Sequence, residues 1–241
     1  MTKSRKLIFI PTYNECDNVA RIISEISDLN LENTDFLFID DHSPDGTGEI
    51  LDTLSRQYPN LSVIHRAKKM GIGSAHLHAI HWAYENQYDI LITMDCDFTH
   101  SPSYIPKLDA ASARHDVVVT SRYMEADSLA EWNLFRKTLT KMGHILTRSV
   151  LRLSYDATGA FRLYKLRNIP PGRFAQIQSN GYSFFFESLF VLDRHGHPIT
   201  EIPIRLPART YGHSKMRMSD ILHSVKQIFI LRYRMTGRQN Q

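Results

Sequence analysis

Ile90-Leu-Ile-Thr-Met-Asp-Cys-Asp-Phe98 is the stretch that decides the fold of this chain. A short, mostly apolar run ends abruptly in two carboxylates, Asp95 and Asp97. Such a run is typical of a buried strand in an α/β sheet, and these sheets bind ligands at the carboxyl ends of their strands. Asp-x-Asp at that point suits a hard divalent cation whose other ligands are substrate diphosphate oxygens. The alternative is a pair of solvated acids, because the motif is short and common.

The pattern on both sides of this stretch alternates between strands and helices. Strands are predicted over residues 7–10, 36–39, 61–64, 116–121 and 201–206, and helices over 19–29, 48–58, 74–83, 133–153, 184–192 and 219–234. This alternation is typical of a parallel, doubly wound sheet. Pro203 favours an edge position for the last strand. We therefore expect one α/β domain over residues 1–241, with a mostly parallel central sheet flanked by helices and a basic, amphipathic C-terminal helix.

Charge divides the chain into two halves. Residues 1–130 carry 11 Lys and Arg against 19 Asp and Glu, whereas residues 131–241 carry 18 against 6. The acidic half could host a metal, and the basic half could host an anion or face an anionic surface. No apolar run approaches the roughly 20 residues of a membrane span, and the first residues do not resemble a signal peptide. The two cysteines indicate neither a disulfide framework nor a zinc site, so we expect a cytoplasmic protein.

Two early strand ends should converge on one nucleotide site. Pro11-Thr-Tyr-Asn-Glu15 follows the first strand, and Asp40-Asp41 follows the second. In a doubly wound sheet these ends line the crevice that receives a nucleotide. The chain has neither the Gly-x-Gly-x-x-Gly of dinucleotide oxidoreductases nor the phosphate-binding loop of ATPases. The sequence thus favours a nucleotide whose phosphates are met by a metal, and nothing in it indicates a nucleic-acid partner.

Several motifs together carry a resemblance to a known family. They are Pro11-Thr-Tyr-Asn-Glu15, Asp40-Asp-x-Ser-Pro-Asp-Gly-Thr47, Arg66-x-x-Lys-x-Gly-x-Gly73, Met94-Asp-x-Asp97, Ser121-Arg-Tyr123, Trp132-x-x-x-Arg136, Thr158-Gly-x-Phe-Arg162, Gly181-Tyr-x-Phe184 with Glu187, and Arg209-x-x-Gly-x-Ser-Lys215. Their order and spacing resemble family 2 inverting glycosyltransferases of the GT-A fold, in particular the dolichol-phosphate and polyprenyl-phosphate mannose synthases. The likeness covers residues 7–216.

The resemblance implies a role for each matching residue. Those assigned to the nucleotide sugar are Pro11, Tyr13, Glu15, Asp40, Asp41, Lys69 and Asp95. Asp95, Asp97 and Thr99 are assigned to a divalent metal, Mg²⁺ or Mn²⁺, although many relatives have Gln at the Thr99 position. Arg122, Arg136 and Thr140 are assigned to the acceptor phosphate. Asp97, Arg122, Arg136, Arg209 and Lys215 form the implied catalytic set, the last two in a mobile basic loop.

The implied reaction moves a hexose, most simply mannose from GDP-mannose, onto a polyprenyl or dolichyl phosphate. A phosphate nucleophile is already ionised near neutral pH, so no protein base is required. The first alternative is another donor, such as UDP-glucose, or a hydroxyl acceptor with Glu187 as general base. The second is a non-catalytic subunit that binds nucleotide sugars.

The lipid acceptor implies contact with the cytosolic face of a membrane. The C-terminal helix would either lie in the headgroup layer or pack on the domain core. Some relatives depend on small membrane subunits, so such a partner is a further candidate. The three histidines of the helix over 74–83, His76, His78 and His81, are expected to cover its surface or to satisfy local hydrogen bonds.

Overall fold

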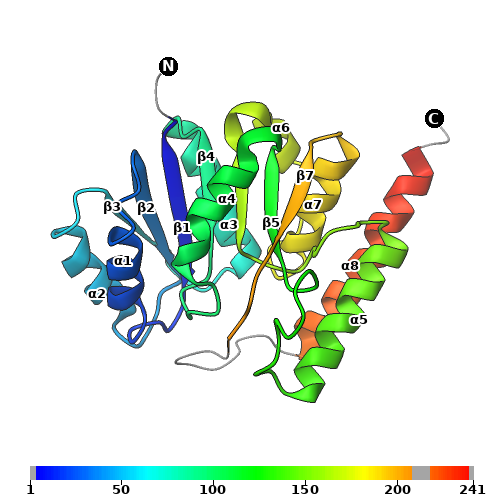
Figure 1. Cartoon of the computed structure of the whole chain (residues 1–241), viewed down its shortest axis with the longest axis horizontal. Helices are drawn as coiled ribbons and strands as arrows, with labels where there is room; N and C mark the ends of the chain where they lie inside the picture. Colours follow the sequence, from blue (N-terminus) through cyan, green and yellow to red (C-terminus); the bar gives the residue numbers. More distant parts are fainter. Residues whose placement is uncertain (1–3, 208–217, 239–241) are drawn as a thin grey trace.

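The fold is built on one seven-stranded sheet. A computed structural model describes residues 4–207 and 218–238, and it describes residues 235–238 by their backbone alone. The strand order is β3-β2-β1-β4-β6-β5-β7 (Figure 1). The strands are β1 (Lys6–Thr12), β2 (Thr34–Asp40), β3 (Leu61–His65), β4 (Ile90–Thr93), β5 (Val117–Ser121), β6 (Arg162–Lys165) and β7 (Ile199–Pro203). The main helices are α1 (Val19–Ser27), α2 (Thr47–Ser55), α3 (Ile72–Glu85), α4 (Ile105–Ala111), α5 (Leu134–Val150), α6 (Pro171–Phe174), α7 (Phe184–Arg194) and α8 (Met218–Arg238).

The sheet is mostly parallel, as predicted. β1 pairs in parallel with β2 and β4, β2 with β3, and β5 with β7. The strand that was predicted at an edge of the sheet corresponds to β7, which lies at one end of the strand order. β6 was not predicted, and it runs antiparallel between β4 and β5. Since β4 and β5 therefore point the same way, their carboxyl ends, with Asp95 and Arg122 just beyond, lie at one edge of the sheet.

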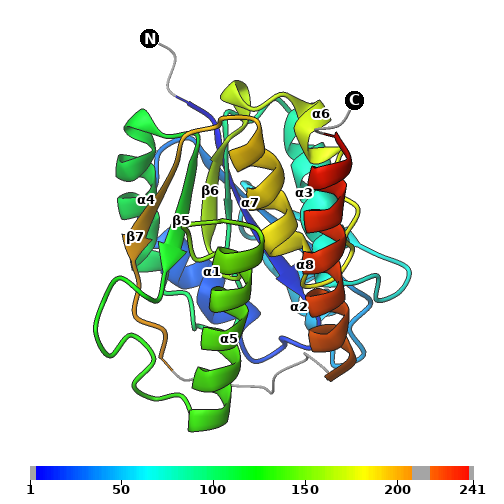
Figure 2. The same ribbon diagram turned by 90° about the vertical axis from the view of Figure 1, so that its right-hand side faces the viewer.

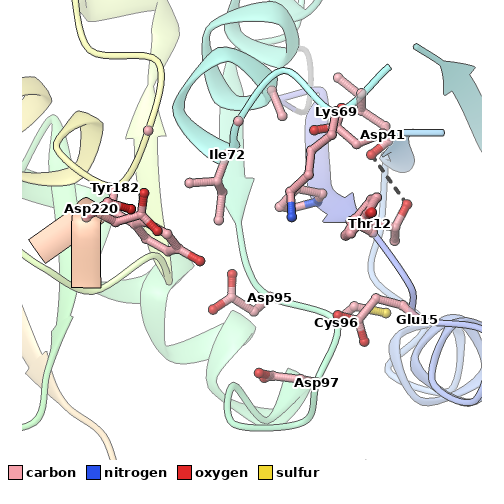
Figure 3. Close-up of a pocket in the computed structure, with 17 residues that line it drawn as sticks. Thr12, Glu15, Asp41, Lys69, Ile72, Asp95, Cys96, Asp97, Tyr182 and Asp220 are labelled. Atoms are coloured by element: carbon pink, nitrogen blue, oxygen red, sulfur yellow. Dashed lines mark hydrogen bonds between the residues drawn. The ribbon is translucent and has the colours of Figure 1, made fainter. Parts of the chain in front are cut away.

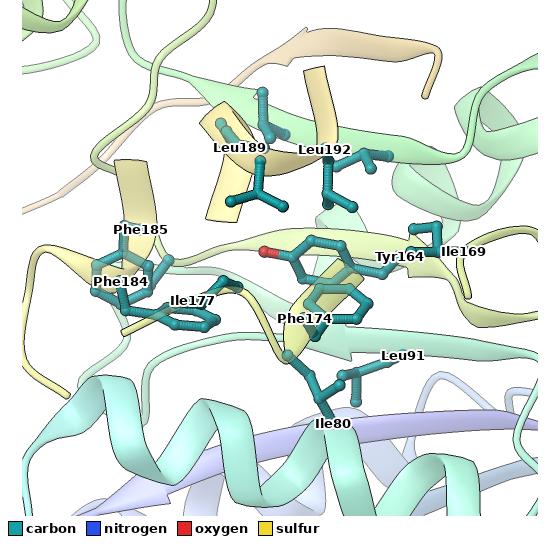
Figure 4. Packing of buried hydrophobic residues seen from close by; sticks show 14 of the residues in the cluster. Ile80, Leu91, Tyr164, Ile169, Phe174, Ile177, Phe184, Phe185, Leu189 and Leu192 are labelled. Carbon is teal, nitrogen blue, oxygen red and sulfur yellow. The ribbon is translucent and has the colours of Figure 1, made fainter. Parts of the chain in front are cut away.

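Alternate side chains of the strands feed two cores, one on each face of the sheet. Leu7 and Phe9 of β1 join the core under α3, α6 and α7, whereas Ile8 and Ile10 join the core under α1 and α4. Figure 4 shows the first core, where Tyr164 of β6 lies among side chains of α6 and α7. A sheet covered on both faces explains why its central strands read as continuous apolar runs.

The C-terminal helix packs on the core through one side only. Ile228 and Leu231 of α8 are each 3% exposed and join the core under α7. Leu222 and Phe229 of the same helix, by contrast, are 67% and 54% exposed. α8 lies beside α5, and the two helices form one end of the molecule (Figure 2).

The expectation for the histidines of α3 is wrong at His76. This side chain is 1% exposed, and neither ring nitrogen has a hydrogen-bond partner within the described part of the chain. His78 is half-buried, and His81 is exposed and lies 3.1 Å from a carboxylate oxygen of Glu85. Spacing along the helix could not separate the three, because the packing of Phe184 and Phe185 from α7 decides which one is covered.

Candidate active site

A cavity of about 390 Å³ opens at the carboxyl ends of β1, β2 and β4. Its wall contains seven of the residues expected at the donor site, and these are Pro11, Tyr13, Glu15, Asp41, Lys69, Asp95 and Asp97. They come from three separate strand ends and from the loop before α3, as Figure 3 shows. The sheet therefore brings together side chains that lie up to 86 positions apart in the sequence.

The two acids that follow β4 are held in a tight loop. Phe98 has a φ of 59°, which is unusual for a bulky residue, and the Arg21 guanidinium lies 4.4 Å from its ring centroid. The hydroxyl of Thr99 donates to Oδ1 of Asp97 at 2.6 Å, and the Thr99 backbone N–H donates to the same oxygen at 3.1 Å. Thr99 is buried behind Asp97 and outside the cavity wall. Its assignment as a metal ligand stays a prediction.

His100 belongs to this loop, although sequence reasoning did not include it. The backbone N–H of Asp95 donates to Nδ1 of His100 at 3.0 Å, and the buried imidazole packs against the ring of Phe161. This hydrogen bond to His100 thus fixes the backbone at Asp95. Its place three residues after the Asp-x-Asp motif was the signal available in the sequence.

The opposite side of the cavity is formed around Tyr13 and Asp41. Nζ of Lys69 lies 3.9 Å from the centroid of the Tyr13 ring, a cation–π contact between the loop before α3 and the end of β1. Asp41 is buried and forms an ion pair with the buried Arg66, and its Oδ2 accepts from Met70 N–H at 3.2 Å. Asp41 therefore ties down the loop that carries Lys69.

Asp40, like Thr99, is a predicted residue that the structure does not bring to the cavity wall. Its carboxylate is buried and accepts hydrogen bonds from the backbone N–H of Ser43, at 3.0 Å, and from the hydroxyl of Thr12, at 3.4 Å. Glu15 does line the cavity, where its Oε2 accepts from Nδ2 of Asn18 at 2.7 Å. Asp40 orders the turn after β2, and its direct contact with a nucleotide stays a prediction.

Arg122 lies at the same sheet edge, beyond the end of β5. Its Nε donates to Oδ2 of Asp156 at 2.7 Å, and Asp156 is fully buried. Burial acts to raise the pKa of Asp156, but the Arg122 charge and hydrogen bonds from Arg122 outweigh it and keep this pKa below the ordinary value. A Cβ atom at Gly159 would lie 3.2 Å from Nη2 of Arg122, so glycine leaves space for the guanidinium. Arg122 is thereby oriented by a buried anion.

Arg136 and Thr140 lie near the start of α5, outside the cavity wall. The Arg136 guanidinium stacks over the ring of Trp132 at 3.5 Å, and the carbonyl of Thr140 accepts from the Tyr123 hydroxyl at 3.0 Å. Because Tyr123 directly follows Arg122, this bond connects α5 to the loop after β5. Arg209 and Lys215 lie outside the described residues.

Tyr182 and Asp220 are among the cavity residues that were missed in the sequence. Both lie on the side of the cavity away from Lys69 and Asp41, Tyr182 just before α7 and Asp220 in the first turn of α8 (Figure 3). Tyr182 falls inside the Gly-Tyr-x-Phe block, which was the available signal. For Asp220 the available signal was that acidic residues are rare in this part of the chain, since it is the last of six acids in residues 131–241.

Known structures share this architecture. Glucosyl-3-phosphoglycerate synthase from Mycobacterium tuberculosis, crystallised with Mn²⁺, uridine diphosphate and phosphoglyceric acid, superposes with a TM-score of 0.66 at 16% identity, over 94% of this chain and 76% of that chain. Mannosyl-3-phosphoglycerate synthase from Rubrobacter xylanophilus gives a TM-score of 0.69 at 18% identity, over 99% and 76%. The sheet with its cavity is thus the GT-A fold of nucleotide-sugar transferases.

Sequence comparison gives the family. Residues 7–169 match glycosyl transferase family 2. The undecaprenyl-phosphate mannosyltransferase of Micrococcus luteus is 35% identical over 213 residues, which cover 88% of this chain and 87% of that protein. The polyprenol monophosphomannose synthase of Mycolicibacterium smegmatis is 31% identical over 227 residues, which cover 93% and 85%. The chain belongs to glycosyl transferase family 2, as the motifs predicted.

Proposed function

We propose that this glycosyltransferase moves mannose from GDP-mannose onto the phosphate of a polyprenyl lipid, with inversion at the anomeric carbon. The observation that carries the proposal is the shared sheet edge. A cavity lined by Asp95 and Asp97 opens at the end of β4, and β5, two strands further along the sheet, presents Arg122 at the same edge. The similarity to two polyprenyl-phosphate mannosyltransferases over most of the chain supports this choice of sugar and acceptor.

The donor would bind with its nucleoside at the Tyr13 side of the cavity and its diphosphate at Asp95 and Asp97. Tyr13 and Lys69 offer an aromatic ring and a cation to the nucleoside and its phosphates, and Glu15 offers a carboxylate to hydroxyl or amino groups. Asp41 acts through the loop that it fixes. We assign Pro11 to the base because it lies in the same wall.

The donor set at Asp95 and Asp97 fits a divalent cation that is held jointly with substrate. Among the residues that the structure describes, no cluster of three or more His, Cys, Asp or Glu could hold a metal alone. Two carboxylates that leave positions for diphosphate oxygens suit Mg²⁺ or Mn²⁺. When bound, the ion neutralises charge on the leaving diphosphate. Thr99 contributes by orienting the Asp97 carboxylate.

Arg122 would hold the acceptor phosphate. β4 and β5 are separated by β6 alone, so their ends lie about 10 Å apart across the sheet edge. That separation supports the proposal, because a phosphate held by Arg122 would lie within reach of a sugar whose diphosphate is bound at Asp95. Arginine suits this task because its planar donors match phosphate oxygens, and Arg136 and Thr140 would complete the acceptor site from α5.

The chemistry requires no protein base. A phosphomonoester with a second pKa of about 6 is largely ionised at neutral pH and can attack directly. Glu187, the base considered for a hydroxyl acceptor, is 1% exposed and accepts backbone N–H bonds from Gln178 and Ser179 at 3.1 and 3.0 Å. It shapes a loop and does not line the cavity. This geometry favours the lipid-phosphate reaction over the hydroxyl alternative.

We further propose that α5 and α8 dock on an anionic bilayer at its cytosolic face. Four large side chains of α8 lie on one exposed face, Met218, Leu222, Phe229 and Tyr233. Leu134, Phe135, Met142 and Ile145 are exposed on the neighbouring α5. Exposed Lys141, Arg148 and Lys226 accompany these two stripes. Apolar side chains beside lysine and arginine are the composition of a helix that lies in an anionic headgroup layer.

Within the described part of the chain, we propose this surface of α5 and α8 as the site of membrane contact. No helix there combines the length and the apolar character that crossing a bilayer requires. A small membrane subunit is a further candidate for this surface. It would bring the same face to the lipid and leave the reaction unchanged.

The acceptor is the part of the proposal to test first. The protein would be incubated with GDP-mannose, Mg²⁺ and one of three acceptors, namely a short polyprenyl phosphate, the same polyprenol without phosphate, or 3-phosphoglycerate. Transfer to the polyprenyl phosphate alone is expected. Transfer to the free alcohol would overturn the phosphate nucleophile, and transfer to 3-phosphoglycerate would place the chain with its structural neighbours instead.

A further inference from the structure

The donor sugar has to lie on the side of the diphosphate that faces away from the nucleoside. If the nucleoside occupies the Tyr13 side and the diphosphate lies at Asp95 and Asp97, the remaining wall is formed by α3, by the segment before α7 and by the start of α8. The polar side chains there are Tyr182, Ser219 and Asp220. From this arrangement we infer that Asp220 recognises the hexose through its hydroxyls and that Tyr182 positions the ring. The inference rests on the proposed function.

The segment that carries Tyr182 is rigidly held. The backbone N–H of Ser74 donates to the carbonyl of Asn180 at 3.0 Å. A Cβ at Gly71 would come within 2.6 Å of that carbonyl, and a Cβ at Gly73 would come within 2.6 Å of the Gly181 carbonyl. Both glycines therefore allow a close approach of two backbones, which fixes Tyr182 against the start of α3. This gives the two glycines of the Arg66–Gly73 motif a packing role.

The other end of the same segment is fixed by a buried carboxylate. Glu187 accepts the backbone N–H groups of Gln178 and Ser179. Tyr182 packs its partly buried side chain against the core under α7. With both flanks held, Tyr182 keeps a fixed place in the cavity wall.

The packing of α8 fixes the position of Asp220 relative to the segment before α7. Ser224, one helical turn after Asp220, lies 3.3 Å from the hydroxyl of Ser183, and Arg234 donates to the side-chain oxygen of Gln178. Ile228 anchors the helix in the core. Residues four apart share a helix face, so the contact at Ser224 directs Asp220 toward Tyr182 and the cavity. Figure 3 shows the Asp220 and Tyr182 side chains together, on the side of the cavity away from Lys69 and Asp41.

Two catalytic roles of a carboxylate do not fit Asp220. It does not form a metal-binding group with Asp95 and Asp97, since no such cluster of three exists among the described residues. A phosphate nucleophile needs no base. A carboxylate repels bound phosphates, so this part of the wall suits a ligand group that is neutral and rich in hydroxyls. The hexose is the neutral part of a nucleotide sugar.

The test compares Asp220→Asn with wild type on GDP-mannose and on analogues that each lack one sugar hydroxyl. We expect kcat/KM for GDP-mannose to fall roughly 10- to 100-fold, because a hydrogen bond to a charged group is lost. For the analogue that lacks the contacted hydroxyl, variant and wild type should turn over within a factor of about 3 of each other. Equal losses for every analogue would overturn the inference.

A binding titration separates the sugar from the nucleotide. Affinity for GDP alone should be unchanged in Asp220→Asn, whereas the affinity for GDP-mannose should fall. An equal fall for GDP would assign Asp220 to the diphosphate and contradict the inference. Glu49→Gln is the matched control, because Glu49 is likewise the acid in the first turn of a helix but lies outside the cavity wall. It should leave both affinities unchanged.

The same titration distinguishes this inference from the proposed function. If wild type makes no mannosyl lipid, the proposed function fails, and the comparison is repeated with UDP and UDP-glucose. Loss of only the sugar-dependent part of the affinity in Asp220→Asn would then still support the inference. Wild-type transfer from GDP-mannose that persists unchanged in Asp220→Asn would refute the inference and leave the proposed function intact.

Discussion

Acid should destabilise this fold through His76, which lies in α3 between three aromatic rings. The ring centroids of Phe9, Phe184 and Phe185 lie 5.1, 5.0 and 5.1 Å from that of His76. Burial, with a smaller contribution from the Arg162 charge, lowers the pKa of His76 from 6.5 to about 3. The contact joins β1, α3 and α7, and the residue before His76 lines the cavity.

The magnitude follows from proton linkage. Between pH 6.5 and 3 the unfolded chain binds a proton at His76 and the folded chain does not, so the stability from this site is complete above pH 6.5 and is lost as the pH falls. One pKa unit corresponds to about 1.4 kcal/mol. The free energy of unfolding should therefore drop by about 2.5 kcal/mol between pH 7 and pH 4.5 through this residue alone.

His76→Leu removes the titrating group and keeps a similar volume. Urea unfolding at pH 7.0, 5.5 and 4.5 should show the variant gaining about 2.5 kcal/mol on wild type over this range. His81→Leu is the matched control, since His81 is an exposed histidine of the same helix, and its pH dependence should stay close to wild type. Parallel pH curves for His76→Leu and wild type would refute the reasoning.

Three further predictions concern the site and the surface. Asp97→Asn should reduce sugar transfer at least about 100-fold with an unchanged circular dichroism spectrum, because a metal-binding carboxylate is lost; full activity would exclude the metal role. Asp156→Asn should lower the unfolding free energy by about 3 kcal/mol and raise the KM for polyprenyl phosphate, because it leaves Arg122 without its buried anion; an unchanged KM would separate Arg122 from the acceptor. Leu222→Asp should weaken sedimentation with anionic vesicles about 10-fold at an unchanged melting temperature, and equal sedimentation would remove α8 from the docking surface.

The sequence predicts the parts of the fold that depend on local patterns. Apolar runs such as residues 36–39 mark buried strands because the sheet is covered on both faces. The acids Asp41, Asp95 and Asp97 could be placed together because the carboxyl ends of parallel strands meet at one edge of the sheet. These inferences required only the period of the pattern and the rules of α/β topology.

The antiparallel strand β6 could not be predicted in this way. Its four residues include Arg162 and Lys165, and both are buried. Nη1 of Arg162 donates to the carbonyl of Phe185 and to the hydroxyl of Ser188, and Nη2 donates to the carbonyl of Ala157. A buried arginine whose acceptors are set by tertiary packing carries no local signal, so this strand could not be read from the pattern.

Asp220 and Tyr182 were missed for a similar reason. α8 follows β7 in the chain, yet its packing on the segment before α7 places its first turn at the cavity. Helical periodicity predicts the helix and its apolar side chains. It does not predict the direction in which the helix packs, because that depends on contacts with residues far away in the sequence. For the same reason the pattern alone does not tell which apolar side chains of α8 are buried, such as Ile228, and which are exposed, such as Leu222.

The central claim is transfer of mannose to a polyprenyl phosphate, and one assay tests it most directly. Purified protein, Mg²⁺ or Mn²⁺ and a short polyprenyl phosphate are incubated with GDP-mannose and, in parallel, with UDP-glucose, and the lipid product is identified by mass. We expect a mannosyl-phosphoryl lipid from GDP-mannose alone, and we expect EDTA to abolish it. A glucosyl lipid from UDP-glucose, or no lipid product while the nucleotide still binds, would contradict the claim.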